Sequence, residues 1–408
     1  MNILKNIPKS VKKLYPNILP TYAKGSYIYT DKNNKYLDYT SGIGALSTGH
    51  NHPYIINKVK DQLDKYVHIP QQIFKSHPIQ IELTEKIINT MPNNELDNIF
   101  YVSSGSEATD NVIKISRKYT GKSNIICMNN GFHGRTIAAL SVTSSNLACK
   151  KDITPLLSNI YYCPDFTEES IKKILEYQSS PDNTAAIFLE PVQGEGGIYS
   201  ADKKFMKYIE RICREHNILL IADEVQCGAM RTGTWWTIEQ MDIIPDLMTF
   251  GKGIASGYPL AGVIGKSEIM NTLSPGSLGG TYGGNAICSA AASATIDILS
   301  DEHIKQHIEK MGTYIKNNLE ALAIVKSVRQ YGLMIGIEFE HYYDINISRY
   351  ILDELEKENI LVLLAGNNNQ YIRILPPLLT TVEEVDLFVN TFIKVSLSLK
   401  NVNNIIYH

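Results

Sequence analysis

The apolar residues of the chain gather in short runs that end at turn residues, and stretches with helical periodicity lie between these runs. Short apolar runs bounded in this way are typical of buried strands. Strands that alternate with helices predict an α/β fold with a mostly parallel central sheet and helices on both faces. The predicted strands are residues 99–102, 124–128, 185–189, 218–223 and 246–250, and the clearest helices begin after Ser106 and span residues 203–216.

The two ends of the chain have different patterns. Tyrosine and isoleucine alternate with polar residues over 26–39, around a polar turn at 31–34, which predicts a hairpin. One helix is expected over residues 286–322, and strands at 327–339, 360–364 and 370–375 predict a smaller α+β domain. We expect an N-terminal segment (1–46) that packs with the small domain, a large domain (47–290) and a small C-terminal domain (291–408).

Two of the predicted strands end in opposite charges. One ends at Asp223, and the other leads into Lys252, which Gly251 and Gly253 flank. Ligands of open α/β sheets bind just beyond the strand ends. A lysine amine placed there can form a Schiff base with a carbonyl cofactor, and pyridoxal phosphate (PLP) also has a ring nitrogen that pairs with a carboxylate. The alternative for these two residues alone is a simple ion pair at the edge of the sheet.

Composition excludes several classes of protein. Hydrophobic residues make up 44% and charged residues 20% of 408 residues, as in globular proteins, and the net charge of -3 gives no reason to expect nucleic acid binding. No apolar stretch is long enough to predict a membrane span. The six cysteines are scattered, which predicts reduced thiols in a cytoplasmic protein. We expect no metal site, since His50 with His52 and His303 with His307 lack a third ligand.

The first 16 residues carry four lysines and no acid, so a targeting sequence must be considered. The segment is short, lacks arginine, and contains Pro8 and Pro16. A first helix with exposed lysines is therefore the favoured interpretation.

Three further turns follow predicted strands and carry candidate chemistry. Residues 103–108 combine serines and a glycine at a helix start, which suits either a phosphate or a simple helix cap. Residues 131–136 contain an aromatic ring that can stack on a planar group and an arginine that can bind a carboxylate. Residues 190–197 place two acids in a glycine-rich loop, which can also be an ordinary solvated loop.

Six motifs in order give the chain its resemblance to the class III (ω-amino acid) aminotransferases of PLP fold type I. The similarity extends from about Pro20 to Thr391. The motifs are SGSEA (104–108), FHGRT (132–136), EPVQGEGG (190–197), ADEVQ (222–226), GKG (251–253) and GGTYGGN (279–285).

The resemblance implies PLP as the cofactor and assigns roles around it. Lys252 would hold PLP as a Schiff base and move the proton, and Asp223 would bind the pyridine nitrogen. Phe132 would stack on the ring, and Gln226 would approach its phenolic oxygen. The phosphate would lie on Gly105 and Ser106, together with Thr281 from a second subunit, which implies a homodimer with shared active sites or a dimer of such dimers.

The resemblance also implies how substrates are selected. Arg373 would bind a carboxylate on the reacting carbon, and Glu195 would pair with it when the donor has none. The remaining substrate residues would be Ile43, Gln72, Arg135 and Glu190. We expect a ping-pong transfer from 4-aminobutyrate or a homologue such as 5-aminovalerate to 2-oxoglutarate. Ornithine, acetylornithine, lysine and diamines stay open as donors, and a non-catalytic scaffold of the same fold is a further alternative.

The chain departs from the family pattern at a few positions. Met230 stands where glycine is usual, Ala286 where proline is common, and Gln330 with Tyr331 interrupts a glycine-rich pattern. None of these touches the PLP chemistry. Met230 and the neighbouring Trp235 and Trp236 are expected to reshape a loop near the pocket.

Overall fold

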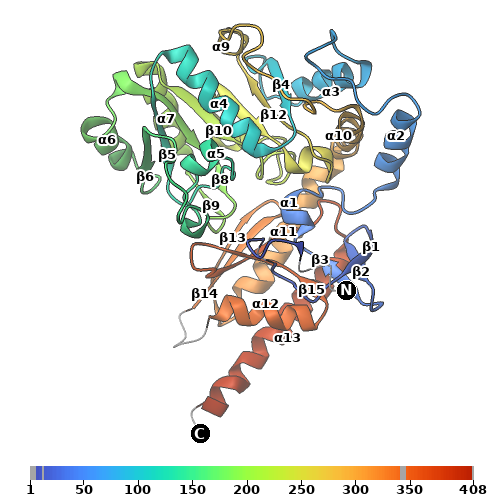
Figure 1. Ribbon diagram of the computed structural model, residues 1–408. Coiled ribbons are helices and arrows are strands. Elements are labelled where there is room, and N and C mark those ends of the chain that lie inside the picture. The colour runs from blue at the N-terminus through green and yellow to red at the C-terminus, as the bar shows by residue number, and fades with distance from the viewer. Residues whose placement is uncertain (1–5, 12, 341–345, 407–408) are drawn as a thin grey trace.

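The computed structural model describes residues 6–11, 13–340 and 346–406, and side chains up to residue 399. A seven-stranded sheet forms the centre of the large domain, with the order β4-β12-β11-β10-β7-β5-β6 (Figure 1). All neighbours pair in parallel except the two that involve β12. The strands are β4 (Asn98–Val102), β5 (Asn124–Met128), β6 (Ile160–Cys163), β7 (Thr184–Leu189), β10 (Leu219–Asp223), β11 (Leu247–Phe250) and β12 (Ala261–Gly265).

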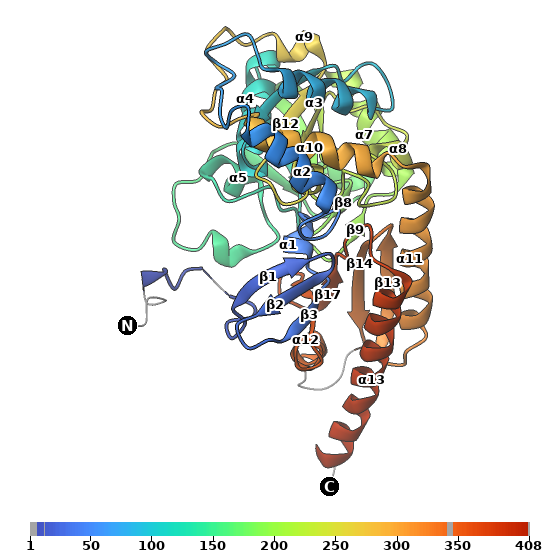
Figure 2. The same ribbon diagram turned by 90° about the vertical axis from the view of Figure 1, so that its right-hand side faces the viewer.

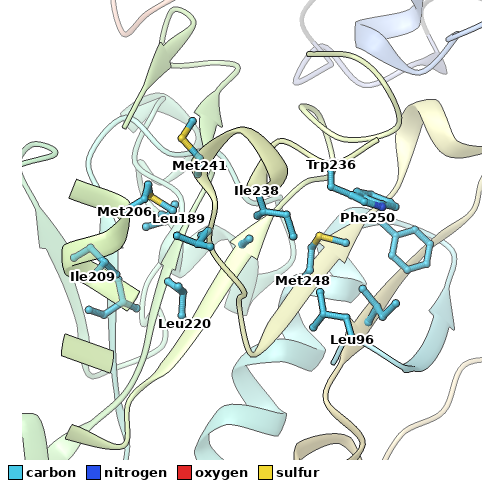
Figure 3. Packing of buried hydrophobic residues seen from close by; sticks show 14 of the residues in the cluster. Leu96, Leu189, Met206, Ile209, Leu220, Trp236, Ile238, Met241, Met248 and Phe250 are labelled. Carbon is cyan, nitrogen blue, oxygen red and sulfur yellow. The ribbon is translucent and has the colours of Figure 1, made fainter. Parts of the chain in front are cut away.

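Helices cover both faces of this sheet, as the sequence predicts. Successive side chains of a strand point to opposite faces. Leu220, Met248 and Phe250 therefore lie in one apolar cluster, which Figure 3 shows, while Leu219 and Leu247 lie in the other. The first face carries α3 (Pro78–Asn89), α6 (Glu168–Tyr177), α7 (Lys203–His216) and α10 (Ala286–Leu299), and the second carries α4 (Gly105–Thr120), α5 (Ile137–Val142) and α9 (Ser267–Met270).

Strand β12 was not predicted. Its five residues are Ala, Gly, Val, Ile and Gly, and they follow a turn that the chain enters directly from the lysine loop. Both glycines are required by packing, since a side chain at Gly262 or Gly265 would collide with neighbours in the sheet. Glycine weakens a strand pattern in the sequence, so only the pairing with β4 and β11 reveals the strand.

The small domain is a four-stranded antiparallel sheet with helices on one face (Figure 2). The expected helix over residues 286–322 is two helices, because Asp301 caps a new helix by accepting from the His303 amide. The strand expected at 327–339 is likewise a hairpin. The elements are β13 (Val325–Tyr331), β14 (Met334–Phe339), β16 (Leu363–Ala365), β17 (Tyr371–Ile374), α11 (Glu302–Glu320), α12 (Ile347–Lys357) and α13 (Val382–Ile406).

The N-terminal hairpin is confirmed and belongs to another small sheet, β1-β2-β3-β15. Leu37 and Tyr39 pack in the core of the small domain. Asn6 has 3₁₀ geometry, and residues 7–11 and 13–16 form turns, bends and irregular chain instead of the expected helix, which Pro8 and Pro16 disfavour. Residues 1–5 and 12 lie outside the described part. The strands are β1 (Pro20–Lys24), β2 (Tyr27–Thr30), β3 (Lys35–Asp38) and β15 (Ile360–Leu361).

We propose that the large domain begins near residue 47 and ends at Leu299. The expected boundary at residue 290 falls inside α10, which packs along its length on α2 (Pro53–Leu63) and α3 of the large domain. Among the described residues, no helix combines the length and the apolar character that crossing a membrane requires.

Candidate active site

A cavity lies at the carboxyl ends of the parallel strands. Strands β4, β5, β7, β10 and β11 each lead into a turn that lines it, which is where ligands bind in open α/β sheets. The fold thereby brings together five turns that lie up to about 150 residues apart. The lining residues are Gly105, Ser106, Phe132, His133, Gly134, Glu190, Asp223, Val225, Gln226 and Lys252.

Asp223 is buried and firmly oriented. Its Oδ1 accepts hydrogen bonds from the Val225 amide at 3.1 Å and from the Thr249 hydroxyl at 2.9 Å. Its Oδ2 lies 2.6 Å from His133 Nδ1, and the His133 ring stacks on Phe188 at 4.1 Å. Sequence reasoning missed His133, although it stands inside the FHGRT motif. A carboxylate held at both oxygens is suited to pair with a cation in the cavity.

Lys252 begins a short turn after β11 and has a left-handed φ of 44°. Burial lowers the pKa of its amine, although the charge of Glu195 opposes this shift. No ion pair joins Lys252 to Asp223 within the described part of the chain. A lowered pKa makes the neutral amine easier to form, and the neutral amine is the form that attacks a carbonyl or takes up a proton.

The start of α4 offers an anion site. Ser104 caps the helix together with Glu107 in a capping box, so the helix cap considered for this motif is present. The described residues provide no acceptor for the amides of Gly105 and Ser106, which begin the first turn. The Ser106 hydroxyl accepts from the Arg135 amide at 3.2 Å, and this approach requires glycine at 134, where a side chain would collide with the hydroxyl. Free amides at a helix start suit a phosphate.

Glu190 lines the cavity and holds the main chain of two of its loops. It is buried, and its oxygens accept from the amides of Phe132 at 2.9 Å and Gly194 at 3.2 Å. Burial raises the pKa of Glu190 to about 7, and the charge of Asp223 adds to this rise. Glu190 therefore positions the Phe132 ring and the loop that carries Glu195.

Arg373 lies on β17 with a side chain that is only 2% exposed. Its guanidinium donates to Glu195 Oε1 at 2.6 Å and to Gln226 Oε1 at 2.9 Å. Burial of Glu195 disfavours its charge, but the attraction of Arg373 is stronger in sum and lowers the pKa of Glu195 below its ordinary value. One hydrogen-bonded charged group at the cavity thus joins Glu195, Gln226 and Arg373. In the sequence, Glu195 lies 31 positions and Arg373 147 positions from Gln226.

Arg135 and Ile43 lie at the rim. The Arg135 side chain is exposed, with its guanidinium 5.8 Å from the centre of the Phe132 ring. Ile43 belongs to α1 (Ser41–Gly44), is 49% exposed, and has a left-handed φ of 64°, a conformation that a β-branched residue adopts only under constraint. The next residue, Gly44, lies against Gln226 and Leu375.

Like Ile43, Arg135, Glu195 and Arg373, the expected site residues Gln72 and Thr281 are not part of the lining of this cavity. Thr281 is exposed, and Gln72 lies beside it, where its amide donates to the Gly280 carbonyl at 2.6 Å. Gln72 instead lines a separate hollow with Tyr101 and Leu278. Within one chain, Gln72 therefore contacts the loop of Thr281 outside the cavity that Lys252 lines.

The sequence departures lie in the packed interior. Met230 has a left-handed φ of 66°, which explains why glycine is usual there, and its side chain belongs to the small-domain core. Trp236 is fully buried and donates to Thr90 at 3.0 Å, while Trp235 packs between two cores. None of them lines the cavity, and their expected effect on a loop near the pocket stays a prediction.

The histidine pairs have other partners than metal. His50 pairs with Asp38 at 2.9 Å, and His307 lies 2.8 Å from the Thr380 carbonyl. His52 precedes α2, as expected of a residue at a helix start, but its side chain makes no capping bond.

The residues of the cavity fit a phosphorylated, planar cofactor with a carbonyl group and a cationic ring. Free amides at α4 match a phosphate, Phe132 matches the ring, Asp223 matches a protonated nitrogen, and Lys252 matches the carbonyl. These are the properties of PLP.

Comparisons with known proteins agree with this geometry. The model of the family described as Aminotransferase class-III matches residues 8–395. The chain is 35% identical to 5-aminovalerate aminotransferase of Pseudomonas aeruginosa, over 91% of both chains. It is 36% identical to 4-aminobutyrate aminotransferase of Escherichia coli, over 93% of both chains. Acetylornithine aminotransferase of Bacillus anthracis is also 36% identical, over 93% of this chain and 94% of that one.

A solved structure has the same fold. The ornithine aminotransferase of Toxoplasma gondii superimposes with a TM-score of 0.87 and 26% identity, over 97% of this chain and 93% of that one. Its crystal structure holds PLP at partial occupancy in the active site. The architecture is thus that of PLP fold type I. The chain belongs to the class III aminotransferases and is a PLP-dependent enzyme that transfers an amino group from an amine donor to a 2-oxo acid.

Proposed function

We propose that the enzyme moves the terminal amino group of an ω-amino acid to 2-oxoglutarate. The observation that carries this proposal is the contact between Glu195 and Arg373 at 2.6 Å. A terminal amine has no carboxylate on its reacting carbon, and a buried arginine left without a partner costs roughly 3–5 kcal/mol. Glu195 neutralises Arg373 in that case, and a 2-oxo acid displaces Glu195 by supplying its own carboxylate.

PLP, when bound, supplies a carbonyl carbon that takes up the amino group and a cationic ring that withdraws electrons from the substrate. With the cofactor in place, Lys252 Nζ would be the base that takes the proton from the reacting carbon of the substrate and delivers it to the cofactor carbon on the other side of the nitrogen. Asp223, oriented by His133, would keep the ring nitrogen protonated. Gly105 and Ser106 would bind the phosphate, Phe132 would stack on the ring, and Gln226 would approach the phenolic oxygen of the ring.

We propose 4-aminobutyrate or 5-aminovalerate as the donor. Both carry their single carboxylate at the far end from the amine, where Arg135 would bind it, with Ile43 beside the chain of the donor. The names of the Pseudomonas and Escherichia relatives support this choice. Acetylornithine is the second candidate, because the Bacillus relative of that name is as similar to the chain.

We propose further that the active enzyme is a homodimer with shared sites. Gln72 contacts the loop of Thr281, and neither residue lines the cavity of Lys252 in its own chain. If Thr281 reaches the phosphate of a second subunit, Gln72 reaches that site with it. Large apolar side chains are exposed near Gln72, which supports the proposal that a second subunit covers this surface. They include Val67, Ile73, Phe74, Ile81 and Tyr282.

The test is a panel of amines at equal concentration with 2-oxoglutarate, scored by glutamate formed. The panel contains 4-aminobutyrate, 5-aminovalerate, ornithine, acetylornithine, lysine and putrescine. We expect the first two to have the highest kcat/KM. A higher value for acetylornithine than for both would overturn the choice of donor, and no turnover of any member would overturn the ω-amine proposal itself.

A further inference from the structure

Arg329 and Arg373 lie in one row across the small sheet. Arg329 of β13 pairs with Gly336 of β14, and Gly336 pairs with Arg373 of β17. Residues paired directly across strands point to the same face. The neighbouring residues Val328 and Ile372 point to the opposite face, into the core under α11–α13. Both arginines therefore face the large domain, on either side of a residue without a side chain.

The loop that carries Glu195 lies in the gap between them. Strands β8 (Val192–Gln193) and β9 (Tyr199–Ser200) form a hairpin, and residues 194–198 are its loop. A side chain at Gly336 would come within 2.9 Å of both the Gly197 carbonyl and Ile198. The loop therefore sits directly on the glycine, and the absence of a side chain there is what allows the close approach.

The two arginines hold different parts of this loop. Arg373 binds the Glu195 side chain, which the proposed reaction requires to leave. Arg329 Nε donates to the Gly197 carbonyl at 2.9 Å, a main-chain contact that no substrate carboxylate replaces. The main chain of Glu195 is also held, since its carbonyl accepts from the Gly366 amide at 2.8 Å.

Arg329 itself is fixed in place. Its guanidinium lies 4.1 Å from the centre of the Tyr199 ring and 4.7 Å from that of Tyr371, whose hydroxyls lie 3.0 Å apart. Glu338 pairs with it at 2.5 Å. A planar cation held by two rings and a carboxylate is a rigid support, since cation–π contacts and an ion pair orient the same group.

We propose that Arg329 is a positioning residue that anchors the main chain of the 194–198 loop, so that the Glu195 side chain alone moves when a carboxylate replaces it on Arg373. This inference rests on the proposed exchange at Arg373. Without the anchor the loop moves as a whole and Glu195 covers Arg373 less well. The kcat/KM for amines without a carboxylate on the reacting carbon then falls more than the kcat/KM for substrates that have one.

Three variants of the PLP-loaded enzyme test this. Arg329→Met removes the anchor, and Gly336→Ala pushes on the loop without altering Arg329. Lys326→Met is the control, because Lys326 also pairs with Glu338 but is 59% exposed and, among the described residues, has no hydrogen bond to the loop. The kinetic readout is the ratio of kcat/KM for 4-aminobutyrate to that for L-glutamate as donors. We expect this ratio to fall about tenfold in both loop variants, mainly through KM, and to stay unchanged in the control.

Hydrogen exchange of the peptide that contains residues 194–198 is the second readout and does not depend on turnover. The amide of Ile198 is hydrogen-bonded to the Gln193 carbonyl at 3.0 Å, so a loosened loop exchanges faster. We expect about tenfold faster exchange in Arg329→Met and Gly336→Ala. Wild-type exchange and a wild-type ratio in both variants would overturn the anchor. If Arg329→Met does not fold, Arg329→Lys, which keeps the positive charge but lacks the Nε donor to the Gly197 carbonyl, takes its place.

The failure of this inference differs from that of the proposed function. A wild-type enzyme that accepts no ω-amine contradicts the proposed function, whereas the exchange rates still report whether Arg329 anchors the loop. An ω-amine enzyme in which both loop variants behave as wild type contradicts the anchor only.

Discussion

His133 Nδ1 lies 2.6 Å from Asp223 Oδ2, and the imidazole is stacked on Phe188. When Asp223 is ionised, His133 Nδ1 carries a hydrogen and donates a hydrogen bond to the carboxylate. The remaining oxygen of Asp223 is held by Thr249 and an amide. This arrangement stabilises the carboxylate in one orientation, as ligands are oriented by the groups behind them in metal and cofactor sites.

Replacing His133 by phenylalanine tests that support. The ring can still stack on Phe188, but the charge-assisted hydrogen bond, worth roughly 1.5–3 kcal/mol, is lost. We expect PLP to bind at least about tenfold more weakly, measured by fluorescence titration of the PLP-free protein. The exposed His303→Phe is the matched control. Unchanged PLP affinity in His133→Phe would contradict the role of the pair.

Replacing Glu195 by glutamine removes the counter-ion of Arg373 and keeps the shape of the side chain. Because the buried guanidinium then lacks a negative partner, we expect kcat/KM for 4-aminobutyrate to fall about a hundredfold, with a smaller change for substrates that have a carboxylate on the reacting carbon. Separate measurement of the donor and acceptor half-reactions gives both values. Glu340→Gln, at an exposed position, serves as the control. An equal loss in both half-reactions would argue against substrate exchange at Arg373.

Mixed dimers test whether Thr281 acts in the other subunit. Lys252→Ala inactivates the active site of its own chain. Thr281→Glu places a negative charge next to the phosphate that Thr281 would bind. Each variant alone is expected to be inactive. In a heterodimer of the two, one site combines an intact Lys252 with an intact Thr281 only if Thr281 comes from the partner, so we expect about half of the wild-type activity. An inactive heterodimer would show that Thr281 serves its own chain.

Glu224 gives a prediction for stability. It is buried beside Asp223, accepts from the Ile238 amide at 2.8 Å, and burial raises its pKa to about 7. The folded protein therefore retains a proton between about pH 4.5 and 7 that the unfolded chain releases, so this contribution to stability is present at low pH and is lost as the pH rises through 7. Glu224→Gln removes the dependence.

The free energy of unfolding in urea at pH 5 and pH 8 measures this effect. We subtract the free energy of unfolding of wild type from that of Glu224→Gln at each pH. This difference is expected to be about 3 kcal/mol more favourable to the variant at pH 8 than at pH 5. The exposed Glu320→Gln is expected to show no such change. A pH-independent difference for Glu224→Gln would mean that the carboxyl is not protonated in the folded protein.

The alternation of strands and helices was predictable because it is local. Buried parallel strands are short apolar runs, and residues such as Asp223 and Lys252 stand out since they end such runs with a charge. The predicted strands missed β12, whose glycines are explained only by the neighbours they touch. The predicted helix over residues 286–322 missed the break at Asp301, because the helical pattern continues through a residue that caps a second helix.

The candidate site was predictable in its parts but not in its assembly. The motifs contain the groups that PLP chemistry needs, because each group stands in a turn with a recognisable composition. Which groups meet depends on contacts across the sheets. The contact of His133 with Asp223 could not be predicted from the sequence for this reason, nor could the position of Gln72 beside Gly280 instead of Lys252.

The sequence by itself determined the fold class, the cofactor and the kind of reaction, since these follow from local patterns and from motifs that occur in order. Only the tertiary structure decided that Arg329, Gly336 and Arg373 share one row and enclose the loop of Glu195. The physical reason is strand register: a shift of one residue turns every side chain of a strand to the other face, and the pairing of distant strands sets that register.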